Sequence, residues 1–447
     1  MSQLYRRNDL INLILNHPPE LPKMAKTVKY FDRIREPDFF RKMAFWVFPG
    51  IDTTAFALQI LQVLFANYQD GDLNLKIDEL RNTNLSILKK FVLSLHDESC
   101  GGFYQTSQNH FPTLHATHCS IALVKAVVGR GNGGEVDYDS LIGSREVDRF
   151  YGADMGNSGS LSSKIIDFVS RCYDQESGGF FETPVELLNN EGVSRRPSIV
   201  ATSSAMWICH QLGIEIEEFL EKYCRSTKEK VTQFVYSLRV KKDGSTSFKN
   251  TTKSEQPWIC SCYYAERLLR NLGEMLSDED IIGMLTFIIK TKNKHSAFCA
   301  GDRLDANLIH TKNALSIITR YHDRLAEISK LDGELFDGKT FLIETYEDVL
   351  SFMRETYVDG GFSPAESFRY MPNIYSTRMA LDIFRYFKVL PALSGVEMRT
   401  PEFLDKGKVV TFLAACYSKE AGAFRGYPYL ESYIPRGYME EHFLVAA

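Results

Sequence analysis

The sequence lacks an excess of positive charge. Its 52 Lys and Arg residues are outnumbered by 57 Asp and Glu residues, and no basic run could form a phosphate-binding face, so we expect no nucleic-acid partner. It also lacks an apolar stretch of the roughly 18 residues that a membrane span needs. The N-terminal segment has neither a signal-peptide core nor a small-residue cleavage site. Together these absences predict a soluble, cytoplasmic protein.

Disulfide pairing is not expected either. Nine cysteines are present, an odd number, and most lie in apolar runs with helical periodicity, such as Cys119, Cys209 and Cys416. This pattern is typical of free thiols that pack as small hydrophobic side chains in a reducing compartment. Aromatic residues are abundant instead, with 30 Phe and 22 Tyr. They can pack a core, and they can also line a large cavity.

An internal repeat organises the chain. A glycine-aromatic turn ends at five positions, namely Phe103, Phe180, Phe248, Phe362 and Phe424. An amphipathic run with helical spacing precedes each turn. A helix rich in Ala, Ser, Thr and Cys is expected to open near Pro49, Pro112, Pro197, Pro257, Ala306 and Pro372. Amphipathic partner helices are expected near residues 79–95, 161–173, 226–239, 279–291, 341–356 and 404–417.

Local chemistry explains this unit. Glycine accepts the positive φ that ends a helix, and proline fits the first turn of the next helix. A helical hairpin cannot bury both faces alone, so copies must stack. We predict an all-α fold, an α/α toroid of six inner and six outer helices with Gly-Gly-Phe turns.

One barrel is expected to cover residues 26–425, between an N-terminal helical segment (1–25) and a C-terminal tail (426–447). Two segments interrupt the repeat, at residues 129–160 and 322–339. The first is rich in Gly, Asp and Ser and is typical of an inserted surface loop.

The Gly-Gly-Phe turn followed by a proline-led helix of small residues resembles the prenyltransferase and squalene-cyclase repeat, over most of the chain. That superfamily includes the class II terpenoid cyclases and the β-subunits of protein prenyltransferases. The resemblance implies a barrel whose inner helices surround an aromatic cavity that holds an isoprenoid chain. It does not choose between the branches.

Alignment of the inner helices on their prolines separates repeat residues from variable ones. Five residues past each proline the chain places Thr54, Thr117, Thr202, Cys262 and Thr377, with Thr311 in the degenerate copy. We interpret the threonines as capping or packing residues. Three residues past stand Asp52, His115, Val200, Cys260 and Tyr375, with Ile309 in the degenerate copy. This second column varies in chemistry and is the candidate site.

Asp52 has two interpretations. As a carboxylate at a helix N-terminus it can cap the helix and interact with its dipole. Alternatively, "GIDTTA" is similar to the Asp-x-Asp-Thr-Thr motif of one group of class II cyclases, with Gly50 where the first Asp stands. This resemblance implies that Asp52 is the catalytic proton donor. A neutral carboxylic acid in a dry cavity has a raised pKa and can protonate an alkene.

Other residues near the expected helix openings are candidates for substrate binding: His115, Tyr375, Tyr263 and Trp258. A diphosphate-bearing substrate also needs cations, and the candidates are Arg195, Arg196, Lys253 and Arg303. These cations are equally consistent with ordinary solvated charges. The acidic run after Ser277 is a helix N-terminus, and the sequence has no Asp-rich Mg²⁺ signature. Mg²⁺ is expected only if it accompanies a diphosphate.

A zinc site is the alternative. Resemblance to protein prenyltransferases, which bind zinc through an Asp, a Cys two residues later and a His on a later inner helix, implies Cys260, Cys262 and His310 as ligands, with Tyr263 in the place of a family tyrosine. Two thiolates and an imidazole with an open fourth position suit catalytic Zn²⁺. Residues two apart on a helix do not share a face, so packing of both thiols in the core is the other interpretation.

Three functions follow. The first is a class II-like terpenoid cyclase that protonates a polyprenyl substrate, with or without a diphosphate, and needs no cofactor. The second is a zinc-dependent prenyltransferase β-like chain, which needs a helical partner subunit. The third is an inactive barrel that binds a lipid or a protein. Peripheral contact with a membrane stays open.

Overall fold

The fold is described from a computed structural model. The structure describes residues 49–65, 87–107, 109, 111–128, 143–151, 160–187, 196–293, 296–300, 306–328, 330–331, 334–365, 372–394, 403–418 and 421–427. The predicted N-terminal segment, the predicted tail beyond residue 427, Arg195 and Arg303 lie outside these residues.

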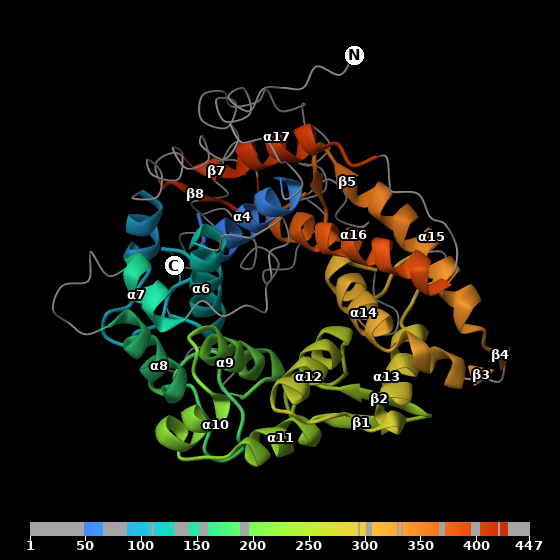
Figure 1. Ribbon diagram of the computed structural model, residues 1–447, viewed down its shortest axis with the longest axis horizontal. Helices are drawn as coiled ribbons and strands as arrows, with labels where there is room; N and C mark the ends of the chain where they lie inside the picture. The colour runs from blue at the N-terminus through green and yellow to red at the C-terminus, as the bar shows by residue number, and fades with distance from the viewer. Residues whose placement is uncertain are drawn as a thin grey trace.

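Six helices form an inner ring. They are α4 (Ile51–Phe65), α6 (Leu114–Val128), α9 (Ile199–Gln211), α12 (Ile259–Asn271), α14 (Leu308–Arg320) and α16 (Ile374–Ser394). In this order each packs against the next, and α16 packs against α4, so the ring closes (Figure 1). The predicted toroid is confirmed.

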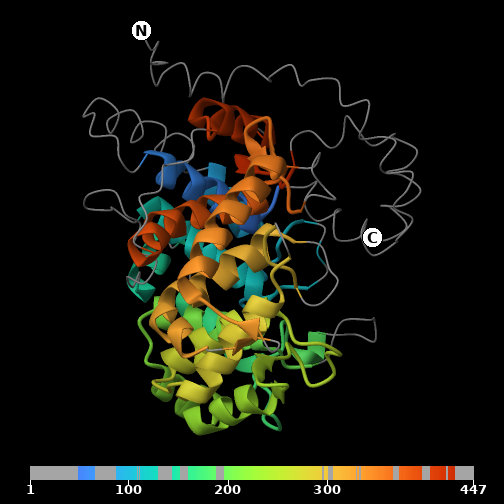
Figure 2. The same cartoon turned by 90° about the vertical axis from the view of Figure 1, so that its right-hand side faces the viewer.

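A second layer of helices lies outside this ring (Figure 1). It consists of a helix at 87–94, α8 (Leu161–Arg171), α11 (Lys228–Ser237), α13 (Asp278–Lys290), α15 (Gly338–Thr356) and α17 (Lys406–Cys416). Apolar side chains of the two layers form one large core cluster, and a second, smaller cluster lies where α4, α16 and α17 meet. Figure 2 shows the same toroid turned by 90°, with the first and last repeats (blue and red) together at one end and the middle repeats (green) at the other.

The glycine-aromatic turns are short β-hairpins rather than simple helix ends. The paired strands are β1 (Arg239–Lys242) with β2 (Ser245–Phe248), β5 (Tyr357–Val358) with β6 (Gly361–Phe362), and β7 (Tyr417–Ser418) with β8 (Ala423–Phe424). At Phe103 and Phe180 the pairing is reduced to single bridges. Between β5 and β6, Asp359 and Gly360 have φ of 47° and 91°. Positive φ at both central residues is what a tight hairpin turn of this hand requires.

A hydrogen bond fastens each turn to the inner helix that follows it. The main-chain N–H of the turn phenylalanine donates to a threonine hydroxyl near the start of the helix, at 2.9–3.2 Å. The pairs are Phe103–Thr117, Phe180–Thr202, Phe362–Thr377 and Phe424–Thr54. Phe298, which forms a β-bridge with Lys292 before the degenerate inner helix, donates to Thr311 in the same way. The aligned threonines are therefore structural, and they hold the turn as well as the helix.

The last of these pairs closes the ring. Phe424 belongs to the final turn of the chain, and it donates to Thr54 of the first inner helix at 2.9 Å. Its carbonyl accepts from the Gly50 N–H at 3.1 Å and from the Thr53 hydroxyl at 2.5 Å. The first and last repeats therefore join as neighbouring repeats do.

A second set of bonds ties each turn to the preceding inner helix. The carbonyl two residues after the turn phenylalanine accepts the first N–H of that helix, at 2.8–3.0 Å. The donor–acceptor pairs are Ile51–Gln105, Leu114–Glu182, Ile199–Asn250, Leu308–Pro364 and Ile374–Gly426. Side chains at this turn position consequently reach the start of the neighbouring inner helix.

The prolines lie further from the helices than predicted. Helix α9 begins two residues after Pro197, and the intervening Ser198 is its N-cap, whose hydroxyl accepts from the Ala201 N–H at 3.0 Å. Ser198 also donates its own N–H to the Phe180 carbonyl at 3.1 Å. Because this bond requires an N–H at the cap position, proline, which lacks one, is accommodated one residue earlier.

The predicted insertion at 129–160 is not loop throughout. Residues Ser144–Tyr151 form α7, whose Val147, Phe150 and Tyr151 are buried, because its apolar face packs against α6 and α8. The second insertion contains η4 (His322–Glu327), β3 (Lys330–Leu331) and β4 (Glu334–Leu335). The remaining short elements are η2 (Val185–Leu187), α10 (Ile216–Phe219) and η3 (Leu220–Cys224).

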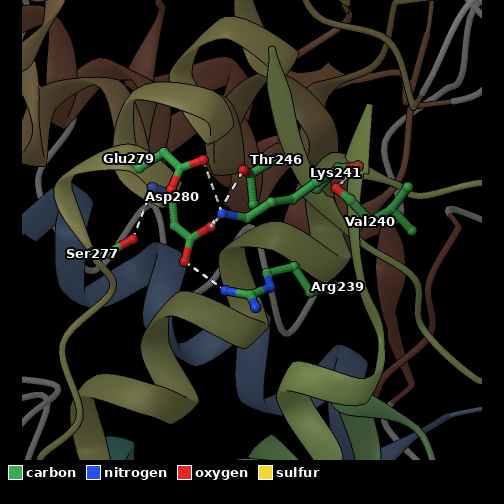
Figure 3. Close-up of polar contacts among 8 residues, drawn as sticks. Arg239, Val240, Lys241, Thr246, Ser277, Glu279 and Asp280 are labelled. Atoms are coloured by element: carbon green, nitrogen blue, oxygen red, sulfur yellow. Dashed lines mark hydrogen bonds and ion pairs between the residues drawn. The ribbon is translucent and has the colours of Figure 1, made fainter. Parts of the chain in front are cut away.

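The acidic run after Ser277 is the N-terminus of α13, as predicted. The Ser277 hydroxyl accepts from the Asp280 N–H at 3.1 Å. The Asp280 carboxylate is almost fully buried and pairs with Arg239 at 2.7 Å and Lys241 at 3.0 Å, both on β1 (Figure 3). This acid therefore anchors a turn hairpin to an outer helix. In the part of the chain that the structure describes, no helix combines the length and apolarity of a membrane span.

Candidate functional site

Electrostatic interactions link side chains of four inner helices. Tyr375 of α16 is half-buried; loss of solvation raises its pKa, and Tyr264, Cys260, Cys119 and Asp52 raise it further. These neighbours come from α12, α6 and α4. We call Asp52, His115, Cys119, Cys260, Tyr264 and Tyr375 the central cluster. The predicted variable column thus contributes four members, Asp52, His115, Cys260 and Tyr375.

Asp52 is the buried acid of the central cluster, at 5% exposure. Its two oxygens accept hydrogen bonds from the Thr53 N–H at 2.7 Å and from the Gln105 amide at 2.6 Å. Burial raises the pKa of Asp52, while His115 and these two donors lower it by less. The carboxyl group therefore keeps its proton to a higher pH than an ordinary Asp, and donors are in place for the carboxylate. Since Thr53 is in the first helical turn, Asp52 also caps its helix.

His115 is the histidine that interacts electrostatically with this acid. Its Nε2 lies 3.8 Å from the Cys119 sulfur, one helical turn along α6. Cys119 is the largest influence on the pKa of His115, which is raised to about 10 against the effect of burial. Asp52 and Glu182 raise it further. These neighbours favour the protonated form of His115.

Two site residues, Gln105 and Glu182, were missed by sequence reasoning. Gln105 donates to Asp52, and Glu182 Oε1 accepts the His115 main-chain N–H at 2.7 Å. Burial raises the pKa of Glu182, and His115 opposes this effect. Both residues stand two positions after a turn phenylalanine, the position that reaches the neighbouring inner helix. That spacing is a signal the sequence contains.

The structure limits what the "GIDTTA" motif can mean. Thr53 and Thr54 both bond Phe424 across the ring closure. A Cβ atom on Gly50 would lie 2.8 Å from Asp52 Oδ1, so the position of the first motif Asp is crowded by Asp52 itself. Among the residues aligned with the cyclase motif, Gly50 has no room for an acidic side chain and the two threonines bond the last turn, so Asp52 is the remaining candidate for a catalytic role.

Cys260 of α12 and His310 of α14 are in contact. The Cys260 sulfur lies 3.3 Å from His310 Nδ1 and accepts from the Asn313 amide at 3.1 Å. Burial lowers the pKa of His310 to about 4, so the imidazole is neutral. Among the nine cysteines, all of which the structure describes, the other eight are buried.

Cys262 does not join this pair. It is fully buried, and burial raises its pKa to about 12 although the Phe248 main chain donates a hydrogen bond to it. Phe248 is the phenylalanine of the third turn, so Cys262 performs the task that threonine performs in the other repeats.

The residues implied for zinc therefore do not fit a three-ligand site. Two of them, Cys260 and His310, are adjacent, whereas Cys262 is engaged by the fold. Within the described residues, no group of three or more His, Cys, Asp or Glu side chains is arranged to hold a metal ion. We derive no chemical step through zinc.

The remaining candidates are separated. Tyr263 lies inside the ring, with its neighbour Tyr264 in edge contact at 5.2 Å between ring centroids. Trp258 and Lys253 are exposed, and Arg196 is half-buried.

Lys312 of α14 and Arg267 of α12 interact with Tyr263 and Tyr264, and the sequence pattern singled out neither cation. Lys312 Nζ lies 4.2 Å from the centre of the Tyr263 ring. Arg267 interacts electrostatically with Tyr263 and Tyr264.

Comparison with known proteins agrees with this architecture. The model of the prenyltransferase alpha-alpha toroid domain matches residues 38–133, 153–256 and 246–336. These segments cover more than half of the chain, which therefore belongs to this family. No curated protein matches it.

Among solved structures, the chain is similar to Candida albicans protein geranylgeranyltransferase-I complexed with GGPP. The match has 14% sequence identity and a TM-score of 0.50, and it covers 93% of this chain and 98% of the other. Identity at this level is evidence for the shared toroid and not for a shared activity.

Proposed function

We propose that the protein is an isoprenoid-processing enzyme in which Asp52 starts a cyclisation by protonating a carbon–carbon double bond of a polyprenyl substrate. The observation that carries this proposal is the state of Asp52: a buried carboxyl group inside a ring of the prenyltransferase family, with its pKa raised by burial. An alkene is a weak base, so its protonation needs an acid that is neutral at rest and shielded from water.

The surroundings of Asp52 suit both products of the proton transfer, the carboxylate and the carbocation. The O–H bond of the acid breaks as its proton forms a new C–H bond, which leaves a carboxylate and a carbocation. The Thr53 N–H and the Gln105 amide donate hydrogen bonds to the carboxylate, and His115 favours it electrostatically. Aromatic faces stabilise the cation, and Phe56 and Tyr375 stand in edge contact beside the cluster, 5.1 Å apart.

Replacement of Asp52 by Asn tests this proposal. The amide keeps the shape of the side chain and removes the transferable proton, so we expect turnover to fall by about 100-fold or more. Products from polyprenols and polyprenyl diphosphates of several lengths are identified by mass spectrometry. Asp280→Asn is the matched control, because Asp280 is a buried acid far along the chain with a structural role. Full activity in Asp52→Asn refutes the proposal.

Prenyl transfer to a thiol is the second candidate. It is favoured by the contact of Cys260 with His310 at 3.3 Å and by the likeness to a protein geranylgeranyltransferase. This activity needs a thiol acceptor, a partner subunit and one equivalent of zinc. Elemental analysis of the purified protein and transfer of a labelled prenyl group to a cysteine peptide distinguish it from cyclisation.

A further inference from the structure

His96 is a buried histidine that the proposed chemistry does not use. It follows the outer helix at 87–94 and forms a β-bridge with Phe103, the phenylalanine of the first turn. The imidazole packs on the Phe103 ring, with the ring centroids 5.0 Å apart. The side chain is 9% exposed, and its Nε2 atom has no hydrogen-bond partner among the described residues. A proton on Nε2 would therefore put a charged donor without an acceptor into the core, which is costly.

Tyrosine occupies the equivalent position in three other repeats. Tyr173, Tyr357 and Tyr417 each pair with the phenylalanine of their own turn, with ring centroids 5.0–5.1 Å apart. Tyrosine does not change its charge between pH 5 and 8, whereas histidine does. Of these four equivalent positions, the one at His96 can therefore respond to weak acid.

The charged groups around His96 act in opposite directions. Burial has the largest effect and lowers the pKa of His96, and Lys164 of α8 lowers it further. Asp97 and Glu98 favour the protonated form, but by less. The Asp97 carboxylate is also engaged by the turn itself, where the Tyr104 hydroxyl donates to it at 2.7 Å. The folded state consequently favours the neutral imidazole.

The same turn supplies a hydrogen bond to Asp52. Gln105 stands two residues past the turn phenylalanine, and its carbonyl accepts the first N–H of α4 at 3.0 Å. Its amide donates to Asp52 at 2.6 Å. The preceding residue, Tyr104, donates its N–H to the Leu95 carbonyl at 2.8 Å, directly before His96. The bridge at His96 and the contact with Asp52 therefore belong to one hydrogen-bonded segment.

We propose that His96 is an acid-sensitive switch: protonation of its imidazole opens the first turn and withdraws Gln105 from Asp52. Because the pKa of His96 is lowered in the folded state, the neutral ring stabilises the turn above the ordinary His pKa of about 6.5. This stability is lost as pH falls through the lower pKa of the folded state. Opening of the turn does not rest on the proposed function, whereas its consequence for turnover does.

Hydrogen exchange of the whole chain, followed by mass spectrometry at pH 7.5 and pH 5.5, tests the switch. An open turn takes up a proton with the ordinary His pKa. After correction for the intrinsic effect of pH on exchange, protection of residues 95–105 should therefore fall by up to about tenfold over this range. The second turn, residues 172–181, is an internal control, because Tyr173 stands there in the place of His96.

Two substitutions remove the proton-binding group. His96→Phe keeps a ring against Phe103, and His96→Gln keeps a polar side chain, so one remains informative if the other does not fold. Circular dichroism at pH 7.5 shows which variants are folded. Both should keep the first turn protected at pH 5.5. The matched control is His210→Gln, which should behave as the wild type does, since His210 is exposed.

The outcomes separate this proposal from the proposed function. Loss of protection confined to the first turn, in the wild type and His210→Gln but not in the His96 variants, supports the switch. Unchanged protection in the wild type, equal loss in the His96 variants, or equal loss at both turns overturns it. If Asp52 is the proton donor, turnover of the wild type should fall towards pH 5.5 and that of His96→Phe should not. A first turn that opens in acid in a protein whose turnover does not depend on Asp52 supports the switch and refutes the proposed function.

Discussion

Two substitutions at Cys262 distinguish a structural thiol from a metal ligand. Threonine and valine have nearly the same shape, but threonine alone can accept the Phe248 N–H. In five other repeats a threonine hydroxyl accepts the equivalent N–H at 2.9–3.2 Å. We expect Cys262→Thr to stay within about 1 kcal/mol of the wild type, because each of those repeats accommodates the extra methyl group.

Cys262→Val should be much less stable than Cys262→Thr. Cys262 is fully buried, so valine leaves the Phe248 N–H without a partner in the core. A buried donor left unsatisfied costs about 1–3 kcal/mol. The difference between the two variants therefore estimates that cost with little change in packing.

Chemical denaturation followed by circular dichroism measures the two stabilities, and elemental analysis measures zinc in the same samples. Equal stability of the threonine and valine variants refutes the hydrogen-bonding role. Loss of one equivalent of zinc in Cys262→Thr refutes the structural interpretation altogether, because threonine keeps the bond to the turn but cannot replace a thiolate ligand.

Three further predictions concern pH and packing. Burial favours the neutral form of Asp280, but hydrogen bonds from Lys241 and others lower its pKa overall. The ionised carboxylate therefore stabilises the folded state at pH above the ordinary Asp pKa of about 3.9. This stability is lost as pH falls through the lower pKa of the folded state. Asp280→Asn should accordingly destabilise the protein at neutral pH and much less in acid, in unfolding curves recorded across pH. Gly361→Ala should cost about 1–3 kcal/mol, because the new Cβ lies 2.7 Å from the Phe412 ring on α17; unchanged denaturation midpoints contradict this packing. If Asp52 is the proton donor, turnover should fall as pH rises through its raised pKa, whereas a rise in rate over that range identifies the carboxylate as the active form.

Repetition made the ring predictable. One turn, one proline-led helix and one amphipathic helix recur along the chain, and such units can bury their faces only against copies of themselves. The threonine column was also visible, although its bond to the turn phenylalanine was not. Sequence shows that Thr377 and Thr54 share a position, but not that the donors are Phe362 and Phe424.

The zinc hypothesis shows where sequence spacing is insufficient. Cys260 and Cys262 are two residues apart, and their separate roles depend on which way each faces. The turn phenylalanine Phe248 engages Cys262, whereas His310 and Asn313 from the next helix engage Cys260. No local pattern gives contacts between residues fifty positions apart.

The sequence by itself determined the repeat, and through the repeat the toroid, because periodic apolar faces and glycine turns act locally and the copies have one way to stack. Tertiary structure alone decided the site. It placed Gln105 against Asp52, Glu182 against His115 and Lys312 over the Tyr263 ring. Burial and charge depend on the neighbours that closure of the ring supplies, and these neighbours come from distant repeats.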